Sequence, residues 1–169
     1  MELKVTIETK GKIFEGKGPE ICREALTAAM YEATTFLERE VKKLTPTGVF
    51  GAGGGLISTI HGEVVGKGTE FIKGIVGHGS VYGDVIEKGR RAGKTWPPEG
   101  ALLRWIEMKI GPADEKDMKR LEFVIRRKIG KKGFPGVHMF ENALKQGWSR
   151  VNKIFDDAGF KATQKLNEG

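Results

Sequence analysis

The sequence predicts an α+β fold in which a small antiparallel sheet packs against a long N-terminal helix and C-terminal helices. Short segments rich in β-branched residues lie between residues 56 and 89 and are separated by glycines, which is typical of antiparallel strands. The flanking segments carry apolar residues at helical spacing and can cover one face of such a sheet. A chain of 169 residues with 38% apolar content predicts a single domain over 1–169.

The N-terminal part is expected to be a strand and turn over 1–18, followed by a long helix over 19–44. Leu3, Val5 and Ile7 alternate on one face of the strand. Pro19 is typical of a first helical turn, and Pro46 ends the helix. The apolar positions of this helix recur every three or four residues: Ile21, Ala25, Ala29, Ala33, Phe36, Leu37 and Leu44.

Residues 45–93 are predicted to form a glycine-rich loop and a β-meander. The loop, TPTGVFGAGGG, is expected to be mobile or held by a partner, because glycines cost ordering entropy and pack no side chains. Three strands are expected at LISTIHGEVV, EFIKGIVG and VYGDVIEKG. On the third strand, Asp84 and Glu87 would point to opposite faces, which makes them a poor acid–base pair.

Residues 97–169 are predicted to be helical. The first helix, PPEGALLRWIEMKIG, ends at Gly111, and the second runs from near Asp114 to Gly130. The third begins at about Val137, and Gly147 is expected to weaken it by about 1 kcal/mol relative to alanine. Its apolar positions are Phe140, Leu144, Trp148, Val151 and Phe155.

The formal charge is +7, and the basic surplus lies in the central and later parts of the chain. The basic loop GRRAGKTWPP and the run RRKIGKK could contact acidic groups of a neighbouring subunit or the phosphates of DNA. The alternatives are plain solvation and, for the run, cations that complement a helix C-terminus. The candidate contact residues are Arg90, Arg91, Lys94, Arg126, Arg127, Lys128, Lys131 and Lys132.

No catalytic, cofactor or metal site is evident, so we expect a protein that is not an enzyme and needs no cofactor. GRRAGKTWPP has the wrong glycine spacing for a phosphate-binding loop, and prolines follow where that loop needs a helix. The three histidines are far apart, and the single cysteine excludes an intramolecular disulfide and a thiolate zinc cluster. No apolar run has the length of a membrane span, so we expect a soluble protein made in the cytoplasm.

The order of these parts resembles the tail-completion, or head-to-tail joining, proteins of long-tailed bacteriophages, also described as neck or minor tail proteins. The clearest element is a segment written Y-x-x-x-x-E-x-G, supplied by Tyr82, Glu87 and Gly89. The glycine-rich loop departs from the Thr-Gly-x-Leu turn of that family, and Gly89-Arg90 replaces its common Gly-Thr. The other matching positions are Pro46, Thr47, Gly48, Leu56, Ser58, Ile60, Gly133, Pro135, Phe140 and Ala143.

The resemblance implies a structural virion protein of a phage or prophage, located in the tail or neck and in the host cytoplasm during assembly. It implies a homo-oligomeric ring, hexameric in that family, that joins the tail to the head. The partners would be further copies, a tail tube or tail terminator protein and a head connector. Residues 49–55 and 90–98 would order against neighbouring subunits, or the basic loop would line a channel for DNA. The alternatives from other classes are a basic nucleic-acid-binding module and a small enzyme.

Overall fold

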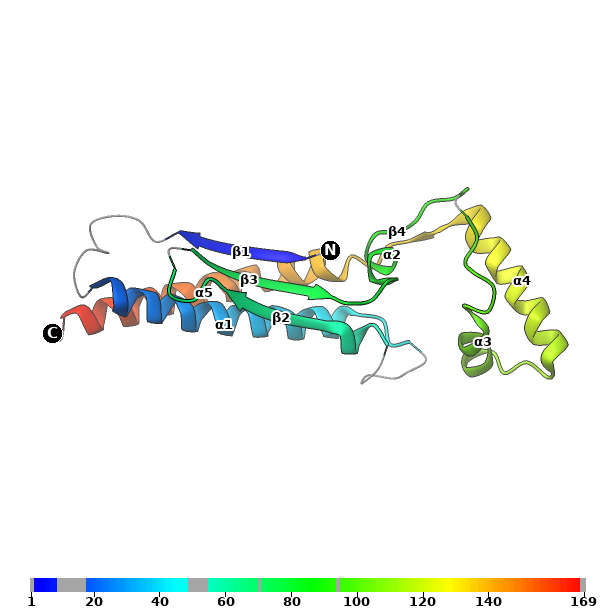
Figure 1. The fold of residues 1–169 in the computed structure, drawn as a ribbon, viewed down its shortest axis with the longest axis horizontal. Helices are drawn as coiled ribbons and strands as arrows, with labels where there is room; N and C mark the ends of the chain where they lie inside the picture. Colours follow the sequence, from blue (N-terminus) through cyan, green and yellow to red (C-terminus); the bar gives the residue numbers. More distant parts are fainter. Residues whose placement is uncertain (1, 9–17, 49–54, 70, 94, 168–169) are drawn as a thin grey trace. The chain divides into compact units, whose positions relative to one another are not determined.

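The computed structural model describes residues 2–8, 18–48, 55–69, 71–93 and 95–167. It confirms the α+β class (Figure 1). The chain divides into two units, each built from separate stretches of sequence. Unit 1 comprises residues 1–44, 60–78 and 139–169, and unit 2 comprises residues 45–59 and 79–138. The single domain expected from the sequence stays a prediction.

Unit 1 contains a three-stranded antiparallel sheet. Its strands are β1 (Leu3–Glu8), β2 (Ile60–Val65) and β3 (Phe71–His78), in the order β1-β3-β2. Gly74 of β3 lies opposite Val5 on one side and Val64 on the other. The N-terminal strand is therefore the third strand of the sheet, and β3 is paired along both edges.

The expected third strand of the meander, residues 81–89, is wrong. Residues Gly83–Lys88 form a short helix, α2, which is followed by the two-residue strand β4 (Gly89–Arg90). Because β1 and β2 occupy both edges of β3, this segment has no free edge of β3 to join. Its amides are satisfied locally instead, since Val85 N and Ile86 N both donate to Tyr82 O at 3.1 Å. The first expected strand is also shorter than predicted, because a 3₁₀ turn occupies Ile57–Thr59.

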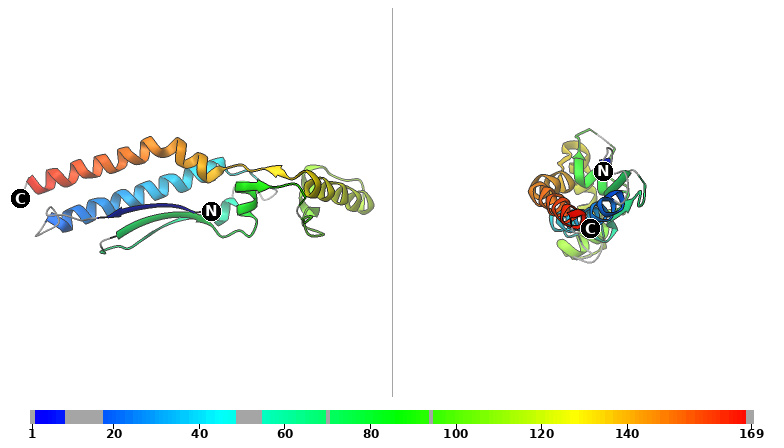
Figure 2. Two further views of the ribbon diagram at one scale, coloured as in Figure 1. Left: turned by 90° about the horizontal axis from the view of Figure 1, so that it is seen from above. Right: turned by 90° about the vertical axis from the view of Figure 1, so that its left-hand side faces the viewer.

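Helix α1 (Gly18–Leu44) confirms the predicted long helix and is the central element of unit 1. The sheet packs against one side of it and α5 (Met139–Asn167) against another (Figure 2, left). Its buried side chains therefore form a band that is displaced around the helix from the predicted stripe, toward Met30, Thr34 and Val41. They are Pro19, Ala29, Met30, Ala33, Thr34, Leu37 and Val41.

Two glycines of the sheet let α1 approach closely. The side chain of Thr34 lies over Gly62 of β2 and Gly74 of β3. A Cβ at Gly62 would lie 2.7 Å from Thr34 Cγ2, and a Cβ at Gly74 would overlap Thr34 Oγ1 and lie 2.8 Å from Met30 Sδ. Both branches of Thr34 are thus confined, so no rotation of this side chain would make room.

Glu38 ties α1 to the outer edge of the sheet. Its carboxylate accepts hydrogen bonds from the backbone N–H of Gly62 at 2.8 Å and from the ammonium of Lys42 at 2.5 Å. Partial burial raises the pKa of Glu38, but these two hydrogen bonds and the charges of Lys42 and His61 outweigh it, so the pKa lies below its usual 4.5.

Helix α5 buries a different stripe from the one predicted. Phe140 and Val151 are buried as expected, but Trp148 is 52% exposed, and Leu144 and Phe155 are half-buried. The remaining buried positions are small or medium-sized: Met139, Ala143, Gly147, Ile154, Ala158 and Ala162. A Cβ at Gly147 would lie 2.8 Å from the Phe36 ring and 3.3 Å from Leu37 Cδ2. Gly147, expected only to weaken the helix, therefore lies at a close contact with α1.

Unit 2 contains α2, a two-stranded pairing of β4 with β5 (Phe134–Pro135), and helices α3 (Leu103–Lys109) and α4 (Glu115–Lys132). Helices α3 and α4 pack together. The Asp114 carboxylate caps α4 by accepting from Asp117 N at 2.7 Å. Gly133, with φ of 65°, follows its last residue, so both ends lie close to the predicted ones.

Replacing Gly74 with alanine is expected to lower the free energy of unfolding by about 1–3 kcal/mol, because the new methyl group overlaps Thr34 and Met30. Gly159→Ala is the matched control in α5, since nothing lies within 4 Å of its Cβ. That control should raise stability by up to about 1 kcal/mol through helix propensity. Urea unfolding measures both variants. Equal stability of Gly74→Ala and the wild type would contradict the close packing of α1 on β3.

The stability contribution of Glu38 should depend on pH. Because its pKa is lowered in the folded protein, the contribution is present above about pH 4.5 and is lost as the pH falls through the folded-state value. Glu38→Gln should cost about 1 kcal/mol at pH 7, and the difference should shrink below pH 4. Glu115→Gln, which removes a fully exposed pair with Lys119, is the control and should cost less. A Glu38→Gln cost that is constant from pH 7 to pH 3 would refute this account.

Candidate functional site

Two segments that carry the phage-protein resemblance meet in unit 2. Strand β4 pairs with β5 so that Gly89 lies opposite Pro135. On the same side, Val137 N donates to Ile86 O at 2.9 Å and His138 N donates to Glu87 O at 3.0 Å. The Y-x-x-x-x-E-x-G segment and the Gly-Pro stretch before the last helix are therefore joined through their backbones, although more than 40 residues separate them in the sequence.

This junction requires glycine. Gly89 has φ of 74°, and a Cβ there would overlap Gly136 N and lie 2.5 Å from Phe134 O. A Cβ at Gly136 would overlap Glu87 O. The side chain of Glu87 is buried at 1% exposure, whereas Tyr82 is 49% exposed. Of the two motif side chains, the charged one is therefore buried and the aromatic one lies at the surface.

The basic loop that follows β4 is held by its own chain. The guanidinium of Arg90 donates to the carbonyl oxygen of Thr95 and, at 3.3 Å, to its hydroxyl. Gly93 N donates to Gly130 O of α4 at 2.9 Å. The described residues of this loop therefore make hydrogen bonds within their own chain, and the expected contact with a neighbouring subunit stays a prediction.

The end of the loop packs on α4 through Trp96. A Cβ at Gly130 would overlap the Trp96 indole, so the ring lies directly against the helix backbone. Trp96 also meets the Phe123 ring edge-on at 5.7 Å. Arg126 Nε donates to Pro97 O at 2.8 Å. Arg126 is thus engaged in fixing the loop, like Arg90.

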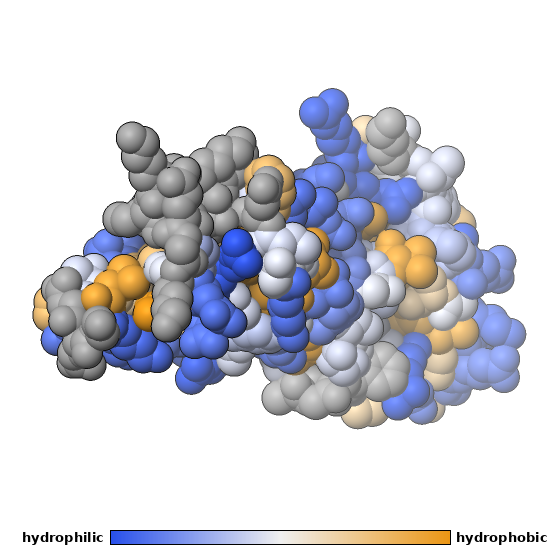
Figure 3. All heavy atoms as spheres, turned by 60° about the vertical axis from the view of Figure 1, so that its left-hand side comes forward, coloured by the Kyte–Doolittle hydropathy of each residue, from blue (hydrophilic) through white to orange (hydrophobic). Residues whose placement is uncertain are grey.

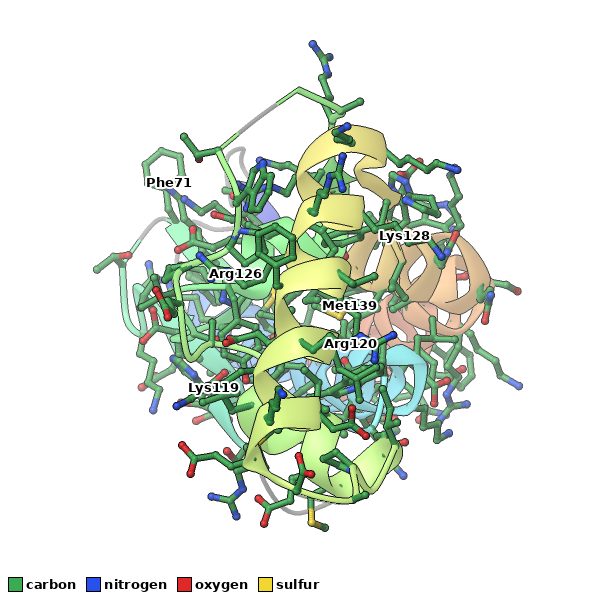
Figure 4. All side chains as sticks on the ribbon, turned by 90° about the vertical axis from the view of Figure 1, so that its right-hand side faces the viewer. Phe71, Lys119, Arg120, Arg126, Lys128 and Met139 are labelled. Carbon is green, nitrogen blue, oxygen red and sulfur yellow. The ribbon has the colours of Figure 1, made fainter. Side chains whose placement is uncertain are left out.

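The remaining candidate cations point outward but do not form one cluster. Arg91, Arg127, Lys128, Lys131 and Lys132 are exposed, and Lys94 lies outside the described residues, as do residues 49–54 of the glycine-rich loop. The run 126–132 winds around α4, so that Arg126 and Lys128 lie on opposite sides of the helix (Figure 4). A run that is continuous in sequence is therefore divided in space.

Three further cations of α4 were missed because they precede the run. Lys116, Lys119 and Arg120 are exposed, and Lys119 pairs with Glu115 at 2.7 Å. A helical projection of residues 115–132 would have revealed Lys116 and Arg120 on the same face as Arg127.

Unit 2 carries nearly all of the net charge. Its stretches contain 14 Lys and Arg against 8 Asp and Glu, a difference of +6 out of the +7 of the chain. Unit 1 has 15 Lys and Arg against 14 Asp and Glu. A partner that binds unit 2 therefore experiences a positive electrostatic potential, and two copies of unit 2 that faced each other would repel.

Among the described residues of unit 2, large hydrophobic side chains are more often exposed than buried. Among the described residues, its buried hydrophobic side chains are Leu56 and Ile106, whereas unit 1 buries 16. On α3, Trp105 and Met108 are 42% and 61% exposed, and Ile110 follows them. On the face of the molecule shown in Figure 3, hydrophobic patches are interspersed with hydrophilic residues. The large exposed hydrophobic residues of unit 2 are Val81, Tyr82, Trp96, Trp105, Met108, Ile110, Phe123, Val124 and Val137.

Concave features occur in both units. On α4 of unit 2, a shallow hollow of about 380 Å³ is lined by Glu115, Lys116 and Lys119. A groove of about 570 Å³ runs between α1 and α5, floored by alanines such as Ala25 and Ala158 and crossed by an Arg150–Glu32 ion pair at 3.2 Å. A hollow of about 130 Å³ on the sheet is lined by residues including His61 and His78. Within the described ranges, no three His, Cys, Asp or Glu side chains are placed to hold a metal ion. In the same part of the chain, no helix is long and apolar enough to cross a membrane.

Comparisons of this chain with models of protein families, with curated proteins and with solved structures gave no significant match.

Gly89→Ala should open the junction between β4 and β5. Gly93→Ala is the matched control, because Gly93 also has a positive φ but has nothing within 4 Å of its Cβ. The control should cost about 1–2 kcal/mol for the backbone conformation, and Gly89→Ala should cost at least about 1 kcal/mol more. In hydrogen exchange, the Val137 and His138 amides should lose protection only in Gly89→Ala. Equal protection in both variants would contradict the requirement for glycine at the junction.

Proposed function

We propose that this protein is a structural virion component of a tailed phage or prophage, of the tail-completion or neck type. Copies of it form a ring that joins the tail to the head, with a tail tube or terminator protein on one side and a head connector on the other. Its role is non-enzymatic and depends on contacts between protein surfaces.

The observation that carries the assembly role is the imbalance in unit 2. A small body that buries Leu56 and Ile106 but leaves Trp105, Met108 and Ile110 exposed has apolar surface available for a partner. Tryptophan, methionine and phenylalanine are enriched at the centres of protein interfaces. In the ring, a neighbouring copy covers the α3 surface, defined here as Trp105 and Met108, which lie about 60° apart around the helix.

The neighbour presents a part of its surface other than unit 2. Two copies of unit 2 would bring +6 against +6, whereas unit 1 is close to neutral. Contact between unit 2 of one copy and unit 1 of the next is a heterologous interface, which closes a ring when its rotation divides a full turn evenly.

The kind of assembly rests on the resemblance, which the junction of β4 and β5 supports. The residues at Tyr82–Gly89 and Gly133–Pro135 were matched to the phage family as separate motifs. The backbones of the two motifs pair with each other, and this pairing needs glycine at Gly89. Both motifs therefore contribute to the same junction. The junction fixes the chain as it leaves α2 and as it approaches α5.

Deleting the gene from its phage or prophage tests the proposal. After induction, electron microscopy should show DNA-filled heads beside separate tails, and infectious titre should fall by several orders of magnitude. Overlong tails would indicate a terminator, and tails of normal length a neck component. Normal infectious particles would contradict the proposed function.

Complementation of the deletion tests whether assembly needs the α3 surface itself, in addition to a folded protein. A plasmid carrying Trp105→Glu and Met108→Glu should make a folded protein that fails to restore the titre, because both side chains are exposed in the subunit. Phe160→Glu, at the most exposed apolar position of α5, is the control and should restore it. Full rescue by the double variant would exclude the α3 surface as the subunit contact.

A further inference from the structure

Beyond its first turn, the exposed charge of α4 is entirely positive. From Met118 to Lys132 this helix has seven Lys or Arg residues and one acid, Glu122. Glu122 is buried, and its carboxylate faces inward to accept from Leu102 N at 3.4 Å. The acids of the first turn are accounted for by the Asp114 cap and the Glu115–Lys119 pair.

Three of these cations, together with Lys116 of the first turn, form a strip along the helix. Lys116, Arg120, Arg127 and Lys131 fall within about 60° of one another around the axis and extend over about 22 Å, given 100° and 1.5 Å per residue. All four are exposed. Within the described part of the chain, none of them forms an ion pair with an acidic side chain. We call these four residues the α4 strip.

The strip is presented by a fixed element. Trp96 packs against Gly130, Arg126 holds Pro97, and α3 packs along the inner side of the helix. Cations on a rigid helix lose less freedom on binding than cations on a loose chain, so they are preorganised for an extended anionic partner.

We propose that the α4 strip binds the phosphate backbone of duplex DNA without reading its sequence. Duplex DNA offers a continuous line of negative charge over the whole length of the strip. An acidic protein would need carboxylates placed against each of four cations. Helix α4 has no Asn or Gln, so it lacks the side chains that pair with adenine edges, and attraction to phosphate is its main contribution.

This inference names a partner beyond the subunit contacts of the proposed function. It concerns the isolated protein and uses a surface separate from Trp105 and Met108. The two proposals can therefore fail independently. Absence of DNA binding by the isolated protein would contradict the role of the strip, whereas normal particles after gene deletion would contradict the virion role.

The test is binding of the full-length protein to a fluorescein-labelled 30-base-pair duplex of mixed sequence, followed by anisotropy from 50 to 300 mM NaCl. The wild type should bind with a Kd of about 10⁻⁴ to 10⁻⁶ M near physiological salt. A plot of its log affinity against log salt concentration should have a slope of about −3.6 or steeper, because the strip neutralises four phosphates. The strip variant replaces all four cations with glutamine: Lys116→Gln, Arg120→Gln, Arg127→Gln and Lys131→Gln. Its affinity for the duplex at 50 mM NaCl should be at least about tenfold lower than that of the wild type. Its slope of log affinity against log salt concentration should be smaller in magnitude by about 3.6.

The control removes the same charge from unit 1 through Lys73→Gln, Lys153→Gln, Lys161→Gln and Lys165→Gln, all at exposed positions. It should keep affinity within about threefold of the wild type, because these four cations are not part of the α4 strip. Circular dichroism checks that both variants are folded.

Three outcomes overturn the proposal. One is no binding of the wild type at 50 mM NaCl, and another is an equal loss in the strip variant and the control. The third is binding to poly-L-glutamate, and not to the duplex, that the strip variant loses, because this result would identify the strip as a surface for acidic protein.

Discussion

The packing of Thr34 over Gly62 and Gly74 is the contact on which the rest of unit 1 depends. Because the sheet presents hydrogen in place of Cβ at these two points, α1 lies close enough for Glu38 to reach the backbone of β2. The other side of α1 is then free to receive α5 at Gly147. One helix thus serves two packing surfaces, which explains why so many of its buried positions are alanine, threonine or valine.

The two units divide the physical properties of the chain. Unit 1 buries most of the core and is almost neutral, so it can be stable as a scaffold. Unit 2 carries nearly all of the net charge and has few buried apolar side chains, and it is held in shape by the β4–β5 junction and by the loop that Trp96 fixes to α4. Apolar contact through α3 and cationic contact through α4 use different helices, so a subunit could meet a neighbour and a polyanion at the same time.

Features set by local signals could be predicted from the sequence, and features set by distant partners could not. Pro19 and Pro46 delimit α1, and Asp114 caps the start of α4, because caps and breakers act within one turn. The end of α4 was expected at Gly130 and lies two residues later, at Lys132. Residues 81–89 have the composition of a strand, but both edges of β3 are already paired, with β1 and β2. The residues of segment 81–89 give no indication of that pairing, because it depends on distant parts of the sequence. The basic run was likewise read along the sequence, whereas the helix separates Arg126, which binds Pro97, from Arg127, which faces outward. Lys116 and Arg120 belong with Arg127 only on the surface of the helix.

The central claim is that the α3 surface of each subunit is covered by a neighbouring copy in the assembled particle. Cryo-electron microscopy of the head–tail junction of the intact phage tests this most directly. The account predicts a ring of this protein in which Trp105 and Met108 are buried against unit 1 of the next copy. A ring in which both side chains remain open to solvent, or a junction that contains no copy of the protein, would contradict it.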